Sequence, residues 1–191
     1  MPSYTIQVEQ KFRKKYADGD SASRFAKQFP SNHHLIEITQ KTFWENWSAY
    51  LKSVDQPIGD SSGFLNWMIG KEAKKSVKVL ISGAGADELW GGYQRHKAFD
   101  VYQKRKEVLL RFQSVLKKLP LGRNYQKFIS AINSDPEKTF LNFSGLDNLP
   151  PELLEDYERI FNRNLPEYTQ MLDFDRQVYL VQDLLKIQDN S

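Results

Sequence analysis

An apolar run that leads into a turn of small residues constrains this chain more than any other feature. Residues 77–81 (Val-Lys-Val-Leu-Ile) are typical of a short strand that is buried on both faces of a parallel sheet. The turn after it, Ser82 to Ala86, carries almost no side chains, so a ligand can approach its backbone closely. Asp87 and Glu88 follow at the expected start of a helix, where a hard cation could bind. Because open parallel sheets bind ligands beyond the carboxyl ends of their strands, the pattern predicts part of a phosphate and magnesium site.

The turn alone does not decide the function, because short glycine motifs also occur in folds that bind no ligand. The longer string is more specific. It resembles the signature of the asparagine synthase family, Ser-Gly-x-Gly-x-Asp-Glu-Leu-x-Gly-Gly-Tyr, which runs here from Ser82 to Tyr93. The resemblance implies a nucleotide site lined by Ser82, Gly83 and Gly85. It also implies a magnesium contact from Asp87.

Two segments ahead of the signature are similar to the same family. Residues 32–38 look like its His-His strand, and residues 54–62 look like its Asp-Glu-Pro loop, with Gln56 where a glutamate is usual. Neighbouring residues on a strand point to opposite faces, so His33 and His34 cannot jointly bind one metal ion. We therefore expect both histidines to be structural.

Three further polar residues are candidates for the substrate side. Asp55 lies in a loop ahead of a helix, where it could contact substrate or only stabilise the turn. Residues 179–189 look like the helical stretch that precedes a Ser-Met-Ala segment in the family, which brings in Asp183 and Lys186. Within the signature, we expect Glu88 to support the helix start rather than to bind a ligand.

The pattern of apolar residues predicts an α/β fold that is followed by helices only. Strands are expected at 4–8, 35–38 and 77–81, with helices between them at 21–29, 42–54 and 61–75. Later helices are expected at 95–118, 123–132, 136–143, 151–162 and 167–189. The resemblance implies a partial parallel sheet of the adenine-nucleotide α-hydrolase type, followed by an all-helical half. We expect one partial synthetase domain over residues 1–191, with an α/β part over 1–94 and a helical part over 95–191.

The helix expected over 95–118 carries the densest basic stretch of the chain. Its apolar residues recur at helical spacing: Val108, Leu109, Phe112, Val115, Leu116 and Leu119. This spacing predicts a core stripe opposite a solvated basic face. A nucleic-acid groove would need aromatic or further basic residues on the same face, and the net charge of +3 is small, so we expect no nucleic-acid partner.

Composition excludes several classes of function. The chain has no cysteine, which excludes disulfides, thiolate metal sites and cysteine nucleophiles. No apolar run reaches the 18 or more residues of a membrane span, and the first residues lack a signal-peptide pattern. We expect a cytoplasmic protein with no membrane partner.

The resemblance implies an ATP-dependent amide ligase. Asparagine synthases activate the side-chain carboxylate of aspartate with ATP and magnesium as a β-aspartyl-adenylate. Ammonia, released from glutamine by a separate amidotransferase domain, then attacks. A carboxylate is a poor electrophile at neutral pH, so it must be adenylated, and the phosphate charge must be neutralised.

Several departures from the family affect this reading. The family's Ser-Gly-Gly-x-Asp-Ser pyrophosphate loop, its glutaminase domain and its later active-site lysine do not occur in these 191 residues. Ala84 stands where the signature often has an acid. We therefore expect an inactive fragment, whose unpaired strand edges favour association, with itself or with the rest of a longer protein. Two alternatives stay open: a relative that acts on another carboxylate, for example by closing a lactam, and a non-catalytic scaffold or regulatory protein.

Overall fold

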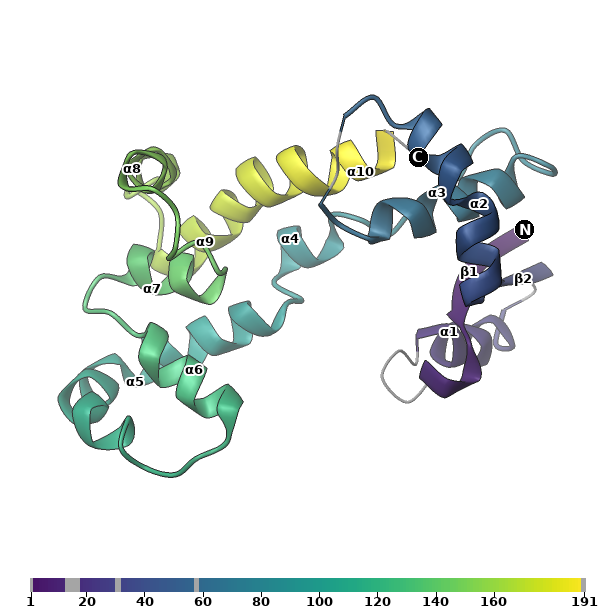
Figure 1. Ribbon diagram of the computed structural model, residues 1–191. Coiled ribbons are helices and arrows are strands. Elements are labelled where there is room, and N and C mark those ends of the chain that lie inside the picture. The colour runs from purple at the N-terminus through teal and green to yellow at the C-terminus, as the bar shows by residue number, and fades with distance from the viewer. Residues whose placement is uncertain (1, 13–17, 30–31, 57–58, 190–191) are drawn as a thin grey trace. The chain divides into compact units, whose positions relative to one another are not determined.

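The computed structural model describes residues 2–12, 18–29, 32–56 and 59–189. Its contacts divide the chain into two compact units, which are described one at a time (Figure 1). The first unit comprises Met1–Ser82 and Leu185–Ser191, and the second comprises Gly83–Leu184. Within the described residues, no helix is both long enough and apolar enough to cross a membrane.

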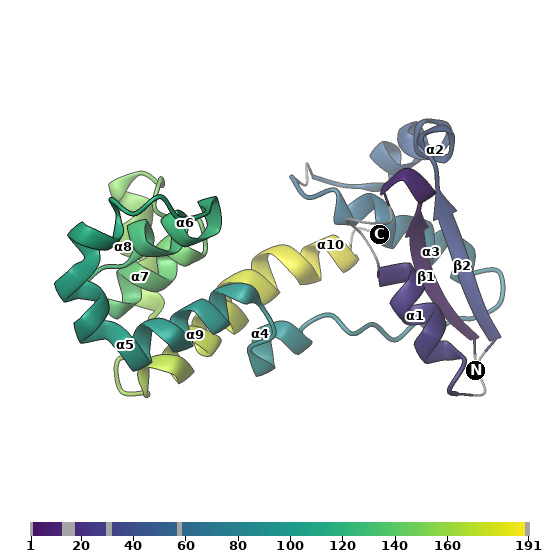
Figure 2. The ribbon, with the colours of Figure 1, turned by 90° about the horizontal axis from the view of Figure 1, so that it is seen from below.

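The first unit contains a parallel pair of strands, as the sequence predicts. Its elements are β1 (Pro2–Val8), η1 (Gln10–Phe12), α1 (Asp18–Ala26), β2 (Asn32–Ile38), α2 (Gln40–Ser53), α3 (Ser62–Ala73) and α10 (Leu185–Asp189). The two strands run side by side in the same direction (Figure 2). Their register pairs Pro2 with Asn32 at one end and Val8 with Ile38 at the other. The helix α1 connects them and packs on both, which is the crossover that parallel strands require.

Side chains just ahead of the helices α2 and α3 accept hydrogen bonds from amides of the first turn. The Thr42 amide donates to the Thr39 hydroxyl over 3.0 Å, and the Ser62 amide donates to the Asp60 carboxylate over 2.8 Å. Such bonds satisfy amides that a helix leaves unpaired in its first turn.

The core of the first unit is small and aromatic. Tyr50, Phe64 and Met68 are buried, and the half-buried rings of Phe43 and Trp47 pack on them. The Phe43 ring lies 4.8 Å from the Phe64 ring, centroid to centroid, in an edge-on arrangement.

The strand expected at residues 77–81 is not formed, and this prediction was wrong. The segment has no regular secondary structure and pairs with neither β1 nor β2, so the described part of the chain has a sheet of two strands. Val79 and Ile81 are 78% and 80% exposed, whereas a central strand would bury both. The physical reason is that a parallel strand needs a hydrogen-bonding neighbour along its length, and no described residue supplies one here.

The second unit is entirely helical in its described residues. Its elements are α4 (Ala86–Trp90), α5 (Gln94–Leu116), α6 (Arg123–Ala131), α7 (Pro136–Phe143), α8 (Pro151–Ile160), α9 (Glu167–Asp175) and the π-helix η2 (Arg176–Leu184). The helices that the sequence predicts after residue 94 are confirmed. The last one, expected over 167–189, consists of α9, η2 and α10 in succession.

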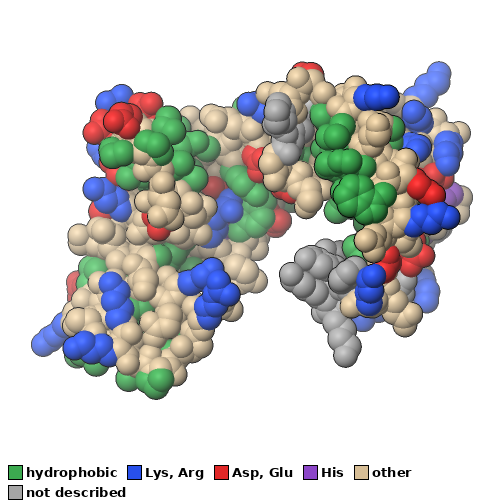
Figure 3. All heavy atoms as spheres, viewed as in Figure 1, with side chains coloured by type: hydrophobic (Ala, Val, Ile, Leu, Met, Phe, Trp, Pro, Cys, Tyr) green, Lys and Arg blue, Asp and Glu red, His purple; other side chains and the backbone are tan. Residues whose placement is uncertain are grey.

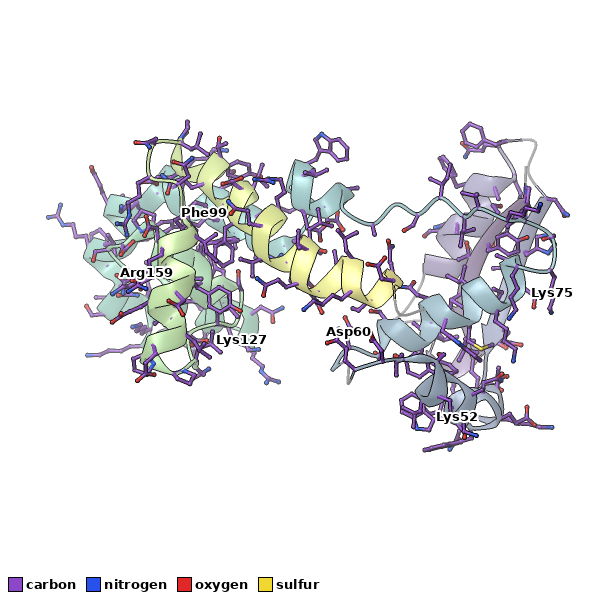
Figure 4. The ribbon with its side chains drawn as sticks, turned by 90° about the horizontal axis from the view of Figure 1, so that it is seen from above. Lys52, Asp60, Lys75, Phe99, Lys127 and Arg159 are labelled. Atoms are coloured by element: carbon purple, nitrogen blue, oxygen red, sulfur yellow. The ribbon has the colours of Figure 1, made fainter. Side chains whose placement is uncertain are left out.

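A continuous apolar core holds these helices together. Ten buried residues form it: Phe99, Tyr102, Ile129, Ile132, Phe140, Leu141, Phe161, Met171, Phe174 and Val178. The Phe140 ring contacts the rings of Phe99, Phe161 and Phe174, with centroid separations between 5.8 and 6.3 Å. Figure 4 labels Phe99 within this unit, while Lys127 and Arg159 extend outward from α6 and α8.

The core stripe predicted for the helix over 95–118 is only partly correct. Leu109 and Leu116 pack on the core of the second unit. Val108, Phe112 and Val115 are exposed instead, since α5 turns a different face inward. Each residue of an α-helix lies about 100° further round the axis than the residue before it. Leu109 and Leu116 therefore face a different direction from Val108 and Val115, and α5 carries two apolar stripes.

Candidate functional site

The turn that carries the glycine signature is open along its main chain. Gly83 is exposed, and a Cβ atom added to it would meet nothing within 4 Å. Gly85 is buried, with a φ of +92°, and its backbone faces the Leu180 side chain of η2. A non-glycine residue is strained at that φ, so Gly85 shapes the turn while Gly83 leaves its surface accessible.

Ser82 ends the first unit and takes part in a contact of that unit. Its hydroxyl accepts a hydrogen bond of 2.7 Å from the side-chain amide of Gln188. Ser82 is exposed, as is Ala84, which stands in the third place of the turn. The methyl group of Ala84 can neither accept a proton nor bind an amine.

Asp87 presents an exposed carboxylate just after the turn. Its carbonyl oxygen accepts hydrogen bonds from the amides of Gly91 and Gly92, over 2.9 and 3.1 Å. Its carboxylate lies against Gly92: a Cβ atom added there would fall 1.7 Å from Oδ1. The second glycine of the Gly-Gly pair therefore makes room for the Asp87 carboxylate.

The neighbouring acid, Glu88, is buried, unlike Asp87. Its carboxylate accepts a short hydrogen bond from the Tyr93 hydroxyl. Burial, together with the Glu88 carboxylate, raises the pKa of that hydroxyl far above its usual value, so it stays protonated and donates. Glu88 thus ties the start of α4 to the end of the signature, in line with a supporting role.

A buried charged network lies behind the signature. The Asp175 carboxylate accepts from Nε2 of His96 over 2.6 Å and from Nη2 of Arg95 over 2.8 Å. His96 and Asp175 are almost fully buried. The Tyr93 amide donates to Nδ1 of His96, which leaves Nε2 as the nitrogen that carries the proton toward Asp175.

Two aromatic rings pack on the Arg95 guanidinium of this network, and a glycine leaves room for a third aromatic side chain beside it. The Arg95 guanidinium lies 4.2 Å from the Tyr93 ring centroid and 4.6 Å from that of Tyr179. Gly91, with a φ of +73°, leaves room for the Tyr168 hydroxyl, which would lie 2.4 Å from an added Cβ atom. The network holds the Gly-Gly-Tyr corner, and through it the backbone that carries Asp87.

Arg95, His96 and Asp175 are not among the site residues predicted from the sequence. A signal existed for Asp175, because a charged residue interrupts the apolar stripe of Met171, Phe174 and Val178. A carboxylate at a core position must be paired to be tolerated, which points to a buried cationic partner elsewhere in the chain.

The remaining candidates lie apart from the turn. His33 accepts from or donates to the Ser3 hydroxyl over 2.9 Å, and the His34 ring stacks on Tyr4 at 4.9 Å, so each histidine serves the strand pair. Asp55 is exposed; the loop that follows it includes residues 57–58, which lie outside the described residues.

Asp183 belongs to a cavity of about 290 Å³ in the second unit. The cavity is also lined by Arg95, Asp175, Tyr179 and Ser144, whose buried hydroxyl has no partner among the described residues. Lys186, on α10, belongs to the first unit.

The residues around Asp87 fit a magnesium ion only in part. The described residues contain no cluster of three or more His, Asp or Glu side chains that could hold a metal ion. Magnesium, however, is commonly bound by one or two carboxylates together with water and the phosphates of a substrate. A single exposed carboxylate such as Asp87 suits that mode.

The fold defines an α/β protein with a helical second half, and its turn is of the open, glycine-rich kind that suits phosphate groups. Comparison with known proteins gives the family. The sequence profile of the asparagine synthase family matches residues 1–191, so the chain belongs to the asparagine synthase family.

Individual relatives agree with this family. A protein of Methanocaldococcus jannaschii that bears the name of a glutamine-hydrolysing asparagine synthetase is 34% identical over 85 residues, 44% of this chain and 16% of its own length. Asparagine synthetase 1 of Bacillus subtilis is 46% identical over 43 residues, 22% of this chain and 7% of its own length. The chain therefore matches less than a fifth of these relatives. No solved structure matches it significantly.

Proposed function

We propose that this chain contributes the nucleotide-facing turn of an ATP-dependent ligase that adenylates the side-chain carboxylate of aspartate and amidates it with glutamine-derived ammonia. The observation that carries the proposal is the exposed main chain at Gly83, followed by the exposed Asp87 carboxylate, within the signature of the family. The names of the relatives support the same reaction.

In this proposal some residues of the signature contact the nucleotide or the metal ion, and others hold the backbone in position. The exposed backbone at Gly83 approaches the phosphates, the buried Gly85 gives the turn its shape, and the Ser82 hydroxyl adds a polar contact. Asp87 holds the magnesium ion, which neutralises phosphate charge when it is bound. Glu88 and Tyr93 keep the Asp87 backbone in place through their buried hydrogen bond.

Calorimetric titration of the chain with ATP and magnesium tests the site. We expect binding that falls at least tenfold in Asp87→Asn, since a neutral amide is a poor ligand for a hard cation. Asp156→Asn is the matched control, because Asp156 is an exposed carboxylate on α8 and its loss should leave binding unchanged.

A second variant separates binding from folding. Gly83→Val adds a side chain where nothing lies within 4 Å, so it should fold normally yet obstruct the approach of phosphates to the backbone. Weaker ATP binding with an unchanged circular dichroism spectrum supports the proposal. If the unaltered chain binds no ATP at about 1 mM, the non-catalytic scaffold is the better description.

We also propose that these 191 residues alone do not turn over, since they contain no Ser-Gly-Gly-x-Asp-Ser loop to hold the leaving pyrophosphate. The assay is ATP–pyrophosphate exchange with aspartate and magnesium. Clear exchange by the isolated chain would refute this part of the proposal.

Ala84 favours a second candidate, in which the same adenylation acts on another carboxylate. An acid at this place of the turn could bind a substrate amine, and the Ala84 methyl cannot. Exchange assays on a longer protein that contains this chain, with aspartate and a panel of other carboxylic acids, distinguish the two. Preference for a substrate without an α-amino group would favour the second candidate.

A further inference from the structure

The long helix α5 presents an apolar stripe to solvent. We call this stripe the α5 seam, which consists of Val101, Val108, Phe112 and Val115. Their side chains are between 47% and 58% exposed. Val108 lies seven residues after Val101, Phe112 four residues after Val108, and Val115 three residues after Phe112. With this spacing all four side chains share one face of the helix. A stripe with this spacing is the pattern of a helix that pairs with another helix.

The α5 seam is not needed for the fold of its own unit. Tyr102, Leu109, Leu110 and Leu116 turn a different face of α5 toward the core. At 3.6 residues per turn, these four residues lie between about a fifth and half of a turn away from the centre of the seam. The seam is therefore apolar although it takes no part in the core of the second unit.

Basic side chains flank the seam on both sides. Arg105 falls on one side, and Lys104 and Arg111 fall on the other, all of them exposed. Two carboxylates, Asp100 and Glu107, lie next to Lys104 and Arg111 on that second side, where the basic residues still include Arg111, which is unpaired among the described residues. Lys104 pairs with Asp100 over 2.7 Å, but neither Arg105 nor Arg111 has an ion pair with a described residue. The Arg111 guanidinium lies 5.7 Å from the Phe112 ring. Lysine and arginine side chains also stand out over this helical part in the space-filling view (Figure 3).

We propose that the α5 seam binds an amphipathic helix of another protein, whose apolar stripe is flanked by aspartate and glutamate. The apolar spacing supplies knobs for helix pairing, and the flanking arginines select an acidic partner. A second copy of this chain would bring one basic flank against another, which disfavours self-pairing through the seam.

Other occupants fit the seam less well. A helix that lies on a membrane buries one wide apolar face and turns a polar face to water, whereas the far side of α5 is packed in a core. Single-stranded nucleic acid needs several stacking rings, and Phe112 is the only aromatic residue of the seam.

A pair of designed peptides tests the proposal. The first is a helical peptide of three heptads with leucine along one stripe and glutamate beside it, and the second has lysine in place of each glutamate. We expect the acidic peptide to bind the full 191-residue chain with a Kd of micromolar order that weakens as salt rises, as measured by fluorescence anisotropy. Absence of binding by the acidic peptide at low salt, or equal binding by the basic one, would overturn the proposal.

Variants assign the binding to the seam. Phe112→Ser and Arg111→Glu alter exposed residues, so both should fold, and each should weaken peptide binding at least tenfold. Leu153→Ser is the matched control, since Leu153 is an equally exposed apolar residue of the same unit, on α8. Equal losses in the control would contradict a specific seam.

The same samples examine the other occupants. Vesicles of phosphatidylcholine with about one third phosphatidylserine, and a single-stranded DNA, are titrated under the same conditions. Binding of either that is stronger than that of the acidic peptide and is lost in Phe112→Ser would overturn the proposal. A dimer in sedimentation equilibrium that Phe112→Ser dissociates would overturn it as well.

Discussion

The two units of the chain bury their apolar residues to very different degrees. The second unit surrounds a core of ten buried residues with helices, and it pairs its buried charges with one another. The first unit has a core cluster of three buried residues, strands whose residues are at most half-buried, and an apolar segment at 77–81 that is exposed. A helix satisfies its own backbone, whereas a strand depends on neighbours.

This difference explains why most of the signature is held in place by the second unit. Gly83 to Tyr93 belong to the unit that is complete in itself, and the buried Glu88, His96 and Asp175 hold them there. The segment at 77–81, which precedes the signature, belongs to the unit whose sheet has open edges. The glycine turn and Asp87 can therefore hold their arrangement without a complete sheet.

The largest effect is expected from a core substitution in the second unit. Phe140→Ala removes a fully buried ring that packs on three others, and it should lower the free energy of unfolding by about 3–5 kcal/mol. Phe43→Ala removes a half-buried ring in the first unit and should cost about 1–2 kcal/mol.

The measurement is urea denaturation followed by two signals. Far-ultraviolet circular dichroism reports the helices, most of which lie in the second unit. Tryptophan fluorescence reports chiefly the first unit, which holds Trp44, Trp47 and Trp67, whereas the second holds the exposed Trp90. Equal losses in the two variants would contradict the contrast between a complete and an open core.

A somewhat smaller effect is expected from Asp175→Asn. The asparagine amide keeps the side-chain volume but removes the negative charge to which Arg95 and His96 both donate. We therefore expect the free energy of unfolding to fall by about 3 kcal/mol. Asp156→Asn, which breaks only an exposed pair with Arg159, should cost less than about 0.5 kcal/mol. Urea denaturation monitored by circular dichroism compares the two, and similar costs would mean that the buried network does not stabilise its unit.

The sequence predicted the fold where the structure depends on local chemistry. The helices of the second unit follow from apolar spacing, and α7 starts where its own sequence favours a helix start, with the Asp135 side chain accepting from the Glu137 amide and Pro136 in the first turn. The parallel pair β1–β2 was likewise correct. The prediction of a strand at 77–81 was wrong because the local composition favours a strand, whereas a strand forms only beside a hydrogen-bonding neighbour, which local composition does not specify.

The candidate site could likewise be predicted only where it depends on local properties of the sequence. Ser82, Gly83, Gly85 and Asp87 could be named because backbone conformation and a single carboxylate are local properties. Their roles in binding remain predictions. The pairing of His96 with Asp175 joins residues 79 positions apart, which no local pattern specifies.

An intermediate effect is expected at the Gly-Gly corner. Gly91→Ala forces a side chain into a left-handed backbone conformation and against the Tyr168 hydroxyl, so it should cost about 1–2 kcal/mol. Gly122→Ala is the control, because that glycine has ordinary φ and nothing within 4 Å of an added Cβ atom. The midpoints of thermal unfolding compare them, and a control as unstable as Gly91→Ala would remove the case for strain at the corner.

The smallest effect on stability is expected from Ile81→Lys in the exposed segment. Because this side chain is already 80% exposed, a charge there should change the free energy of unfolding by less than about 0.5 kcal/mol. The same charge should reduce self-association in sedimentation velocity, since a lysine in this exposed apolar segment discourages it from pairing as a strand with another chain. A loss above about 2 kcal/mol would mean that residue 81 is buried in solution, and the contrast between an open first unit and a complete second one would fail.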